Sequence, residues 1–307
     1  MKWFNILICL VVLTACNNKT KENVNAEKGE KPVFEMVDVP TLIVDKTERA
    51  DYLIDHYWDK FDFTDTTYIH YPEVTEQAFS NFLGFLPYAH PEKVSPAIKK
   101  MLKKAEAEPK MYAYFTDLYE HYLYDPNSMM RNEELYIIVL ETIVESPLLG
   151  EDEKIRPAHL LKLALKNRLG ESATDFAYTL PDGKKGKLYG VSAERLILYF
   201  YNPDCDACRE TTRELQQSTV IKGLMAEKKV KILAVYPDED LQAWKEHLEE
   251  MPGDWILSYD KEVKLKNEEI YDLKAIPCLY LLDKNKVVLL KDAPFEQVEA
   301  FLYNSQL

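Results

Sequence analysis

The sequence predicts a protein of two parts, an all-helical bundle at residues 33–170 followed by an α/β domain at residues 171–307. Three observations support this prediction. Apolar residues of the first half recur at helical spacing, and short strand-favouring runs alternate with helical segments in the second half. Between one such run and the next helix stands Cys205-Asp206-Ala207-Cys208, two thiols separated by two residues. The combined length suits two domains.

Six segments of the first half carry apolar stripes, in which residues three or four positions apart share a face. Ser95-Pro96 is typical of an N-cap followed by proline, and Gly170 of the residue after a helix. The many tyrosines are interpreted as core residues with a hydrated hydroxyl edge rather than as a ligand groove. The loop at 122–128 is the candidate for surface contact, because its Asp-Pro-Asn sequence must turn in solvent. The stripes occupy residues 52–61, 78–86, 98–105, 112–122, 135–142 and 157–169.

Strands and helices alternate in the second half, and the last two predicted strands form an antiparallel pair ahead of a closing helix. This order predicts a sheet covered on both faces. The turn between the first two strands is Pro181-Asp182-Gly183. The predicted strands occupy residues 176–180, 187–189, 196–201, 230–236, 278–283 and 287–290, and the predicted helices 209–224, 239–250 and 294–302.

The two thiols at the strand-to-helix junction can close a small, reversible disulfide. Unpaired N–H groups and the helix dipole favour a thiolate at Cys205, and a thiolate is the attacking species in disulfide exchange. A structural bridge over so short a loop adds little stability. A zinc site needs two further ligands, and neither a second such motif nor a suitably spaced histidine supplies them. The motif therefore favours redox chemistry over a structural disulfide or a metal site, and we expect neither a metal nor a cofactor.

The N-terminus has the pattern of a bacterial lipoprotein signal. Lys2 precedes an apolar run at residues 3–13, and Leu13-Thr14-Ala15-Cys16 resembles a lipobox. The run is too short to span a bilayer comfortably and is typical of a signal peptide at residues 1–15. Cys16 would then carry the lipid, and the polar segment 16–32 would be a flexible tether. We expect a lipid anchor in the bacterial cell envelope, facing the periplasm; the alternative is an ordinary secretory signal with an incidental cysteine.

Net charge limits the partners. The formal charge is −14, and removal of residues 1–15, which contain Lys2 as their only charged residue, leaves −15. This charge disfavours nucleic acid and anionic lipid as electrostatic partners. No glycine-rich phosphate-binding loop is present.

Several landmarks of the second half appear in the order typical of one family. Over residues 172–307 the chain resembles the thioredoxin-like, TlpA/ResA-type thiol–disulfide oxidoreductases. The first half resembles the uncharacterised helical domain found ahead of such domains in some bacterial lipoproteins. The landmarks are Asp175-Phe176, Pro181-Asp182-Gly183-Lys184, the run 198–208 that ends on the cysteine motif, Ile276-Pro277 and Leu282-Asp283.

The resemblance implies a role for each site residue. Cys205 would attack a substrate disulfide, and Cys208 would resolve the mixed disulfide. Pro277 would follow a cis peptide bond, which places the Ile276 backbone beside the sulfurs to bind the substrate as an added strand. The implied partners are a disulfide-containing protein substrate and a membrane electron donor. The expected activity is that of a reductase or isomerase; the alternative is a non-catalytic binding lipoprotein that uses the fold as a scaffold.

Departures from the family pattern also carry expectations. Asp204 and Asp206 flank Cys205, and carboxylates on both sides oppose its thiolate, which favours a more reducing couple. Tyr199 stands where thioredoxins carry a buried carboxylate. Cys278 follows Pro277, where the family usually has threonine. We interpret Cys278 as a small core residue, and the alternative is a third thiol that reaches the pair.

Lipidation can be tested directly. A fatty-acid analogue supplied to growing cells is expected to label the wild-type protein and to leave Cys16→Ser unlabelled, because acyl chains on that residue form the anchor. A wild-type protein without label would contradict the lipoprotein assignment.

Overall fold

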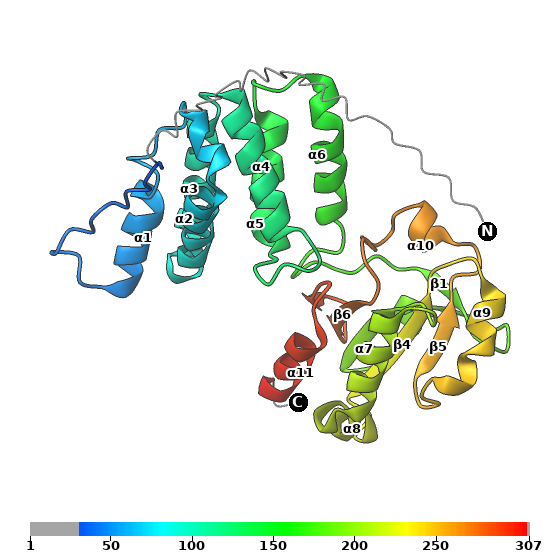
Figure 1. Ribbon diagram of the computed structural model, residues 1–307. Helices are drawn as coiled ribbons and strands as arrows, with labels where there is room; N and C mark the ends of the chain where they lie inside the picture. The colour runs from blue at the N-terminus through cyan, green and yellow to red at the C-terminus, as the bar shows by residue number, and fades with distance from the viewer. Residues whose placement is uncertain (1–30, 306–307) are drawn as a thin grey trace, which may run out of the picture.

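The computed structural model describes residues 31–305, which form a helical domain and an α/β domain (Figure 1). The predicted signal peptide, Cys16 and nearly all of the predicted tether at 16–32 lie outside this range. Within residues 31–305, no helix has both the length and the apolar character that a bilayer span requires.

Six α-helices make up the helical domain, as predicted, with two short 3-10 helices between them. Helix α5 packs against α3, α4 and α6, and α1 packs against α3. Aromatic rings fill the core: Phe79, Phe82 and Phe115 are fully buried, and Trp58 contacts the last two edge-on. The elements are α1 (Lys46–His56), η1 (Thr66–His70), α2 (Pro72–Phe85), η2 (Leu86–Tyr88), α3 (Pro91–Ala105), α4 (Pro109–Leu123), α5 (Glu133–Glu145) and α6 (Glu151–Ala164).

Two of the predicted helix starts were wrong for a similar reason. Helix α3 begins at Pro91, after an extended His90, so Pro96 lies inside the helix and Ser95 is not its N-cap. Helix α6 begins at Glu151, and Pro157 lies in its interior. The predictions took an internal proline as the first helical residue. Gly170 does have a positive φ of 79°, but it lies in the connection after α6 and not directly at the helix end.

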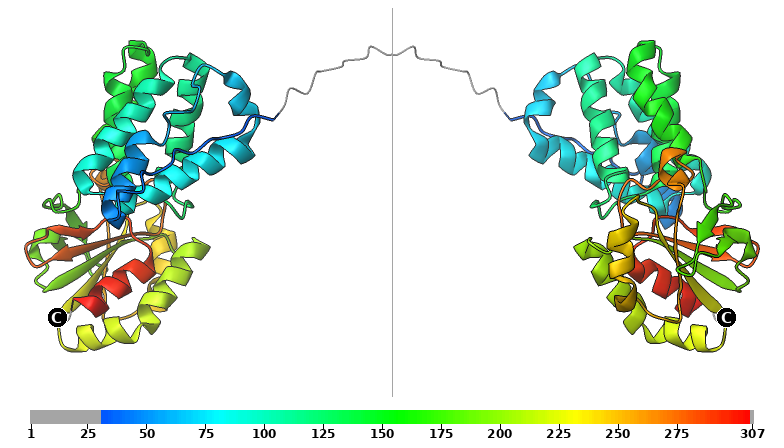
Figure 2. Two further views of the ribbon diagram at one scale, coloured as in Figure 1. Left: turned by 90° about the vertical axis from the view of Figure 1, so that its left-hand side faces the viewer. Right: turned by 90° about the vertical axis from the view of Figure 1, so that its right-hand side faces the viewer.

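The α/β domain contains a seven-stranded sheet with strand order β2-β1-β5-β4-β3-β6-β7. Strands β3, β4 and β5 are parallel, and the other pairings are antiparallel. Figure 2 shows the helical domain above this sheet and α8 and α11 below it. The elements are β1 (Ala177–Thr179), β2 (Lys185–Lys187), η3 (Leu188–Gly190), β3 (Arg195–Phe200), α7 (Asp206–Gln217), α8 (Thr219–Ala226), β4 (Val230–Tyr236), α9 (Leu241–Glu246), η4 (Leu248–Glu250), β5 (Ile256–Tyr259), α10 (Lys264–Asn267), β6 (Cys278–Asp283), β7 (Val288–Leu290) and α11 (Phe295–Asn304).

The prediction from the sequence omitted or displaced several of these elements. Strand β5 and helix α10 were not predicted, because neither is long enough to show a period. The segment 187–189, predicted as a strand, is mostly the 3-10 turn η3 that follows β2. The helix predicted at 209–224 begins earlier, at Asp206, and is interrupted at Ser218, whose hydroxyl accepts the Ile221 N–H at 3.0 Å and starts α8.

The two faces of the sheet bury separate cores. Strands β3 and β6 pair so that Phe200 lies opposite Cys278 and Tyr199 opposite Leu279. Because neighbouring residues of a strand point to opposite faces, Phe200 and Cys278 belong to one core, while Tyr199 and Leu279 belong to the other. Cys208 also lies in the second core.

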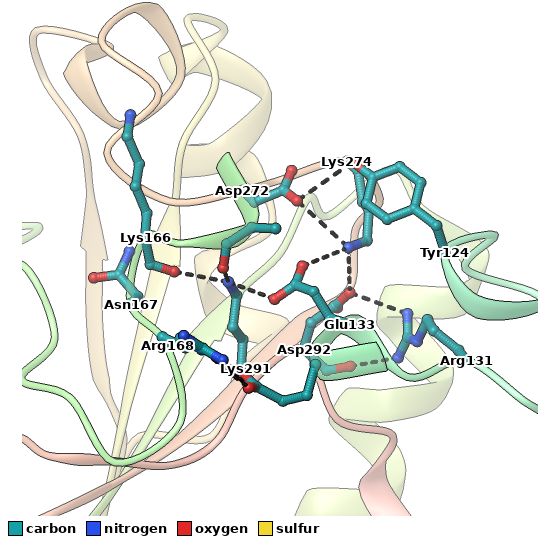
Figure 3. Close-up of polar contacts among 12 residues, drawn as sticks. Tyr124, Arg131, Glu133, Lys166, Asn167, Arg168, Asp272, Lys274, Lys291 and Asp292 are labelled. Atoms are coloured by element: carbon teal, nitrogen blue, oxygen red, sulfur yellow. Dashed lines mark hydrogen bonds and ion pairs between the residues drawn. The ribbon is translucent and has the colours of Figure 1, made fainter. Parts of the chain in front are cut away.

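A buried group of charges joins the two domains (Figure 3). Lys274 lies 3.3 Å from Glu133, 3.4 Å from Asp272 and 3.7 Å from Asp292. Lys291, whose side chain is 5% exposed, pairs with Glu133 at 2.5 Å. We call this group, completed by Arg131, the interdomain charge cluster. It contains three cations and three carboxylates: Arg131, Lys274, Lys291, Glu133, Asp272 and Asp292.

The interdomain charge cluster also binds the backbone. Lys291 donates to the carbonyls of Ala164 at 2.8 Å and Lys166 at 2.7 Å, at the C-terminal end of α6. Arg131 donates to both the carboxylate and the carbonyl of Asp292. Cations at the end of a helix satisfy carbonyls that have no partner within it. The cluster therefore fixes α6 and the start of α5 against the α/β domain.

Replacement of Lys291 by Met should weaken this junction. A buried charge that loses its partner costs about 3–5 kcal/mol. Since Lys274 still faces Glu133, we expect a loss of about 3 kcal/mol and a thermal unfolding midpoint lower by roughly 6–12 °C, measured by circular dichroism. Lys222→Met, an exposed lysine of α8, is the matched control. Equal midpoints for the two variants would show that the junction does not depend on the cluster.

Candidate active site

Cys205 is the N-cap of helix α7, with extended backbone dihedral angles of −92° and 119°. Its sulfur accepts the Cys208 N–H at 3.2 Å and lies 3.6 Å from the Ile276 carbonyl, to which the thiol donates. The side chain is half-buried. An N–H group at a helix N-terminus stabilises negative charge on the atom it faces. Cys205 is therefore accessible and placed to react as a thiolate.

Cys208 lies in the first turn of α7 and has a different environment. It is 1% exposed, and its sulfur accepts the Asn202 N–H at 3.5 Å. Burial, followed by the hydrogen bond with Cys205, raises the pKa of the Cys208 thiol far above its ordinary value. Cys208 therefore stays protonated at neutral pH until its neighbour changes. Both thiols are free in the structure.

Tyr199 occupies the space beneath Cys208. Its hydroxyl donates to the Cys208 carbonyl at 2.8 Å and lies 3.0 Å from the Thr212 hydroxyl. Its ring stacks on that of Tyr201, at 5.3 Å between centroids. Burial raises the pKa of Tyr199, so the hydroxyl remains neutral. The residue thus takes the place of a buried carboxylate without supplying a group that ionises at neutral pH.

The loop before β6 brings backbone to the sulfurs. The Ile276–Pro277 peptide bond is cis, as the resemblance implied. The Ile276 carbonyl faces Cys205, and among the described residues none accepts a hydrogen bond from the Ile276 N–H. Both residues of this peptide are only half-buried. An extended chain can therefore add to this edge by backbone hydrogen bonds.

The two carboxylates that flank Cys205 are exposed, and one of them is paired with an arginine. The Asp206 side chain is 96% exposed and pairs with Arg209. Arg209 in turn donates to the Pro203 carbonyl at 2.7 Å, which fixes the turn ahead of the motif. The Asp204 N–H donates to the Asn202 side chain at 2.9 Å, and Asp204 itself is exposed. Direct action of Asp204 or Asp206 on Cys205 stays a prediction.

Cys278 faces away from the pair. It belongs to the core on the opposite face of the sheet from Cys208, and it is 1% exposed. Burial, followed by the nearby Asp292 carboxylate, raises the pKa of Cys278 well above its usual value. This placement favours the interpretation as a core residue over that of a third exchanging thiol.

A groove of about 310 Å³ opens beside the cis peptide bond. Helix α7 lines it with Ala207, Thr211 and Glu214, and the cis-proline loop lines it with residues 275–277. The start of α11 and a loop of the helical domain complete it. Within the described part of the chain, no three His, Cys, Asp or Glu side chains are grouped closely enough to hold a metal ion.

Comparison with known proteins identifies both halves of the chain. A family model described as thioredoxin-like matches residues 194–288, and one described as a domain of unknown function, DUF5106, matches residues 13–167. A crystal structure of a thioredoxin-like protein from Bacteroides caccae shares 47% identity, covers 89% of this chain and 99% of its own, and superposes with a TM-score of 0.87.

The chain is a thioredoxin-like protein with a DUF5106 domain. Two further comparisons each cover less than half of this chain. A thiol-disulfide oxidoreductase named ResA from Bacillus cereus is 27% identical over 140 residues, which are 45% of this chain and 78% of the relative. The C-terminal domain of an uncharacterized protein from Bacteroides fragilis is 52% identical over 45% of this chain and 98% of its own, with a TM-score of 0.44.

The thioredoxin-like domain brings four of the predicted site residues together: Cys205, Cys208, Ile276 and Pro277. Sequence reasoning noticed Tyr199 only as a departure and did not foresee its hydrogen bond to Cys208. It also missed the effect of Asp292 on the pKa of Cys278, because a carboxylate 14 residues downstream carries no local signal.

Alkylation should separate the three thiols. Iodoacetamide at neutral pH is expected to modify Cys205 of the reduced native protein at least about tenfold faster than Cys208 or Cys278, because Cys205 is only half-buried, whereas Cys208 and Cys278 are each 1% exposed and burial raises the pKa of both. Peptide mass mapping measures the sites, and unfolding in denaturant, which should expose all three, is the control. After oxidation the same mapping should find a Cys205–Cys208 bridge and a free Cys278; a bridge to Cys278 would contradict the core assignment.

Proposed function

We propose that this protein is a thiol–disulfide oxidoreductase that exchanges its Cys205–Cys208 dithiol with a disulfide in a protein substrate. One observation carries the proposal: an accessible Cys205 sulfur at a helix N-terminus lies against a cis-proline backbone, with a buried, protonated thiol beside it. The name of the ResA relative supports the same chemistry. No metal or organic cofactor is needed for this exchange.

The exchange proceeds in two substitutions at sulfur. The Cys205 thiolate attacks one sulfur of the substrate disulfide, whose S–S bond breaks as the mixed disulfide forms, and the released sulfur takes up a proton. Cys208 then loses its proton and attacks the Cys205 sulfur, which frees the second substrate thiol. Two electrons pass from the enzyme dithiol to the substrate. The enzyme ends as the disulfide, and a thiol donor at the membrane returns it to the dithiol.

The burial of Cys208 sets the order of the two substitutions. Burial in apolar surroundings, and then the neighbouring Cys205 sulfur, raise the pKa of Cys208 and so keep its proton in place while Cys205 is a thiolate. Formation of the mixed disulfide removes that charge, so Cys208 becomes easier to deprotonate. The resolving step is therefore coupled to substrate capture. Tyr199, which holds the Cys208 carbonyl, keeps the first turn of α7 in place during this step.

The proposed location is the periplasmic side of the cell envelope, with a lipid on Cys16 as the anchor. The lipobox-like sequence supports this proposal. In that compartment the protein would act as a reductase or isomerase. The second candidate is a binding lipoprotein without catalysis, and the tyrosine that replaces the usual buried carboxylate is the observation that favours it.

Insulin reduction distinguishes these candidates. In the presence of dithiothreitol the wild-type protein is expected to speed precipitation of the insulin B chain, and Cys205→Ser and Cys208→Ser are expected to lose at least about 100-fold of that rate, since each removes one substitution step. Cys278→Ser should retain it. Equal turbidity curves for the wild type and Cys205→Ser would favour the binding lipoprotein.

A further inference from the structure

One wall of the groove beside the cysteines belongs to the helical domain. The connection between α4 and α5, residues 124–132, contributes Pro126, Asn127 and Arg131 to the groove lining. They line the same space of about 310 Å³ as Ala207 and Thr211 of α7 and the cis-proline residues Ile276 and Pro277. A chain that adds to the Ile276 backbone must therefore lie against both domains.

This connection, which we call the α4–α5 loop, is fixed in place. The Ser128 hydroxyl donates to the Tyr122 carbonyl at 2.6 Å, and the Asn127 N–H donates to Asp125 at 2.8 Å. At the end of the loop, Arg131 binds Asp292 of the thioredoxin-like domain at 3.0 Å. At its start, the ring of Tyr124 lies 4.3 Å beneath the Lys274 ammonium. Because the α4–α5 loop is held at both ends, it keeps its shape when a substrate binds. It can therefore discriminate between substrates that fit this shape and those that do not.

The groove has an uncompensated negative charge. Four charged residues line it: Arg131, Asp292, Glu214 and Glu296. The first two pair with each other. Among the described residues, no cation forms an ion pair with Glu214 or Glu296. Burial, followed by the neighbouring Glu296 and Glu210, raises the pKa of Glu214, and Arg213 opposes part of this shift. A cation in the groove could pair with Glu214 and Glu296, which both line it.

We propose that the α4–α5 loop completes the substrate site, and that the site selects an extended protein segment with a basic side chain next to its disulfide-bonded cysteine. The inference rests on the proposed function. The Ile276 backbone binds the segment as a strand, Glu214 and Glu296 bind the basic side chain, and Pro126 and Asn127 form the opposite wall. Complementary charge raises the rate of encounter as well as affinity. The helical domain thus acts as a selectivity element of the reductase.

Two matched peptides test this proposal on the full-length reduced protein. Each carries one cysteine as a mixed disulfide with thionitrobenzoate, flanked by arginines in one peptide and by glutamates in the other. Release of the coloured thiol gives the second-order rate constants. We expect the wild type to prefer the arginine peptide, and Glu214→Gln/Glu296→Gln to reduce that preference about fivefold. Glu145→Gln/Glu194→Gln, with the same change in net charge at sites outside the groove, should keep it.

A change of charge in the α4–α5 loop tests the role of this loop in selection. Asn127→Arg is expected to slow the arginine peptide and speed the glutamate peptide, with a combined shift in preference of about fivefold or more. Asn285→Arg, in the turn between β6 and β7 at the opposite end of β6 from Cys278, should not shift it. Thermal unfolding confirms that each variant is folded.

The outcomes separate the two proposals. If the wild type releases no thiol from either peptide, nor from the small disulfide of hydroxyethanethiol, the proposed function is wrong. If it releases thiol from both peptides, but the preference is the same in the wild type, the groove variants and their controls, the exchange stands and the role of the α4–α5 loop is refuted. If the peptide preference shifts in Glu214→Gln/Glu296→Gln but not in Asn127→Arg, selection is limited to the thioredoxin-like domain. That result would overturn the part assigned to the helical domain.

Discussion

The interdomain charge cluster is the constraint on which the arrangement of the site depends. Three cations and three carboxylates are removed from most of the solvent at the junction of the domains. Charges in such a place are favourable only when each one is paired and hydrogen-bonded. Glu133 satisfies both Lys274 and Lys291 only if the start of α5 lies where it does. Apolar contact alone would allow the domains to slide, whereas this pairing permits one position.

Short stretches of chain connect the interdomain charge cluster to the reacting sulfurs. Lys274 is two residues from Ile276, whose carbonyl accepts a hydrogen bond from the Cys205 thiol. On the other side, Asp292 precedes Ala293, whose N–H donates to the Leu279 carbonyl at 3.0 Å. The cis-proline loop is therefore held between strand β6 and the helical domain. A thioredoxin fold without such a partner would leave one side of this loop in solvent.

Local signals in the sequence predicted much of the fold and the core of the site. The apolar strand 196–201, the Asn-Pro-Asp turn and the spaced cysteines specify a strand, a turn and a helix within 13 residues, so the pair could be placed without a structure. The six helices were found by their period, but α3 and α6 began earlier than predicted, since proline is tolerated inside a helix when packing outweighs the lost hydrogen bond. The charge cluster could not be predicted, because Arg131 and Asp292 are 161 residues apart and each resembles an ordinary surface charge.

The position of Cys278 on the far face of the sheet has a consequence for the chain as it forms. Before the sheet assembles, the thiols at 205, 208 and 278 can join in three different pairs. Once β6 pairs with β3, Cys278 is enclosed by the core around Phe200 and Tyr280. Only the Cys205–Cys208 pair can then form. A newly made chain in an oxidising environment therefore avoids the two pairs that contain Cys278 if its central strands assemble before that cysteine reacts. While the sheet is intact, burial keeps Cys278 from pairing with Cys205 or Cys208.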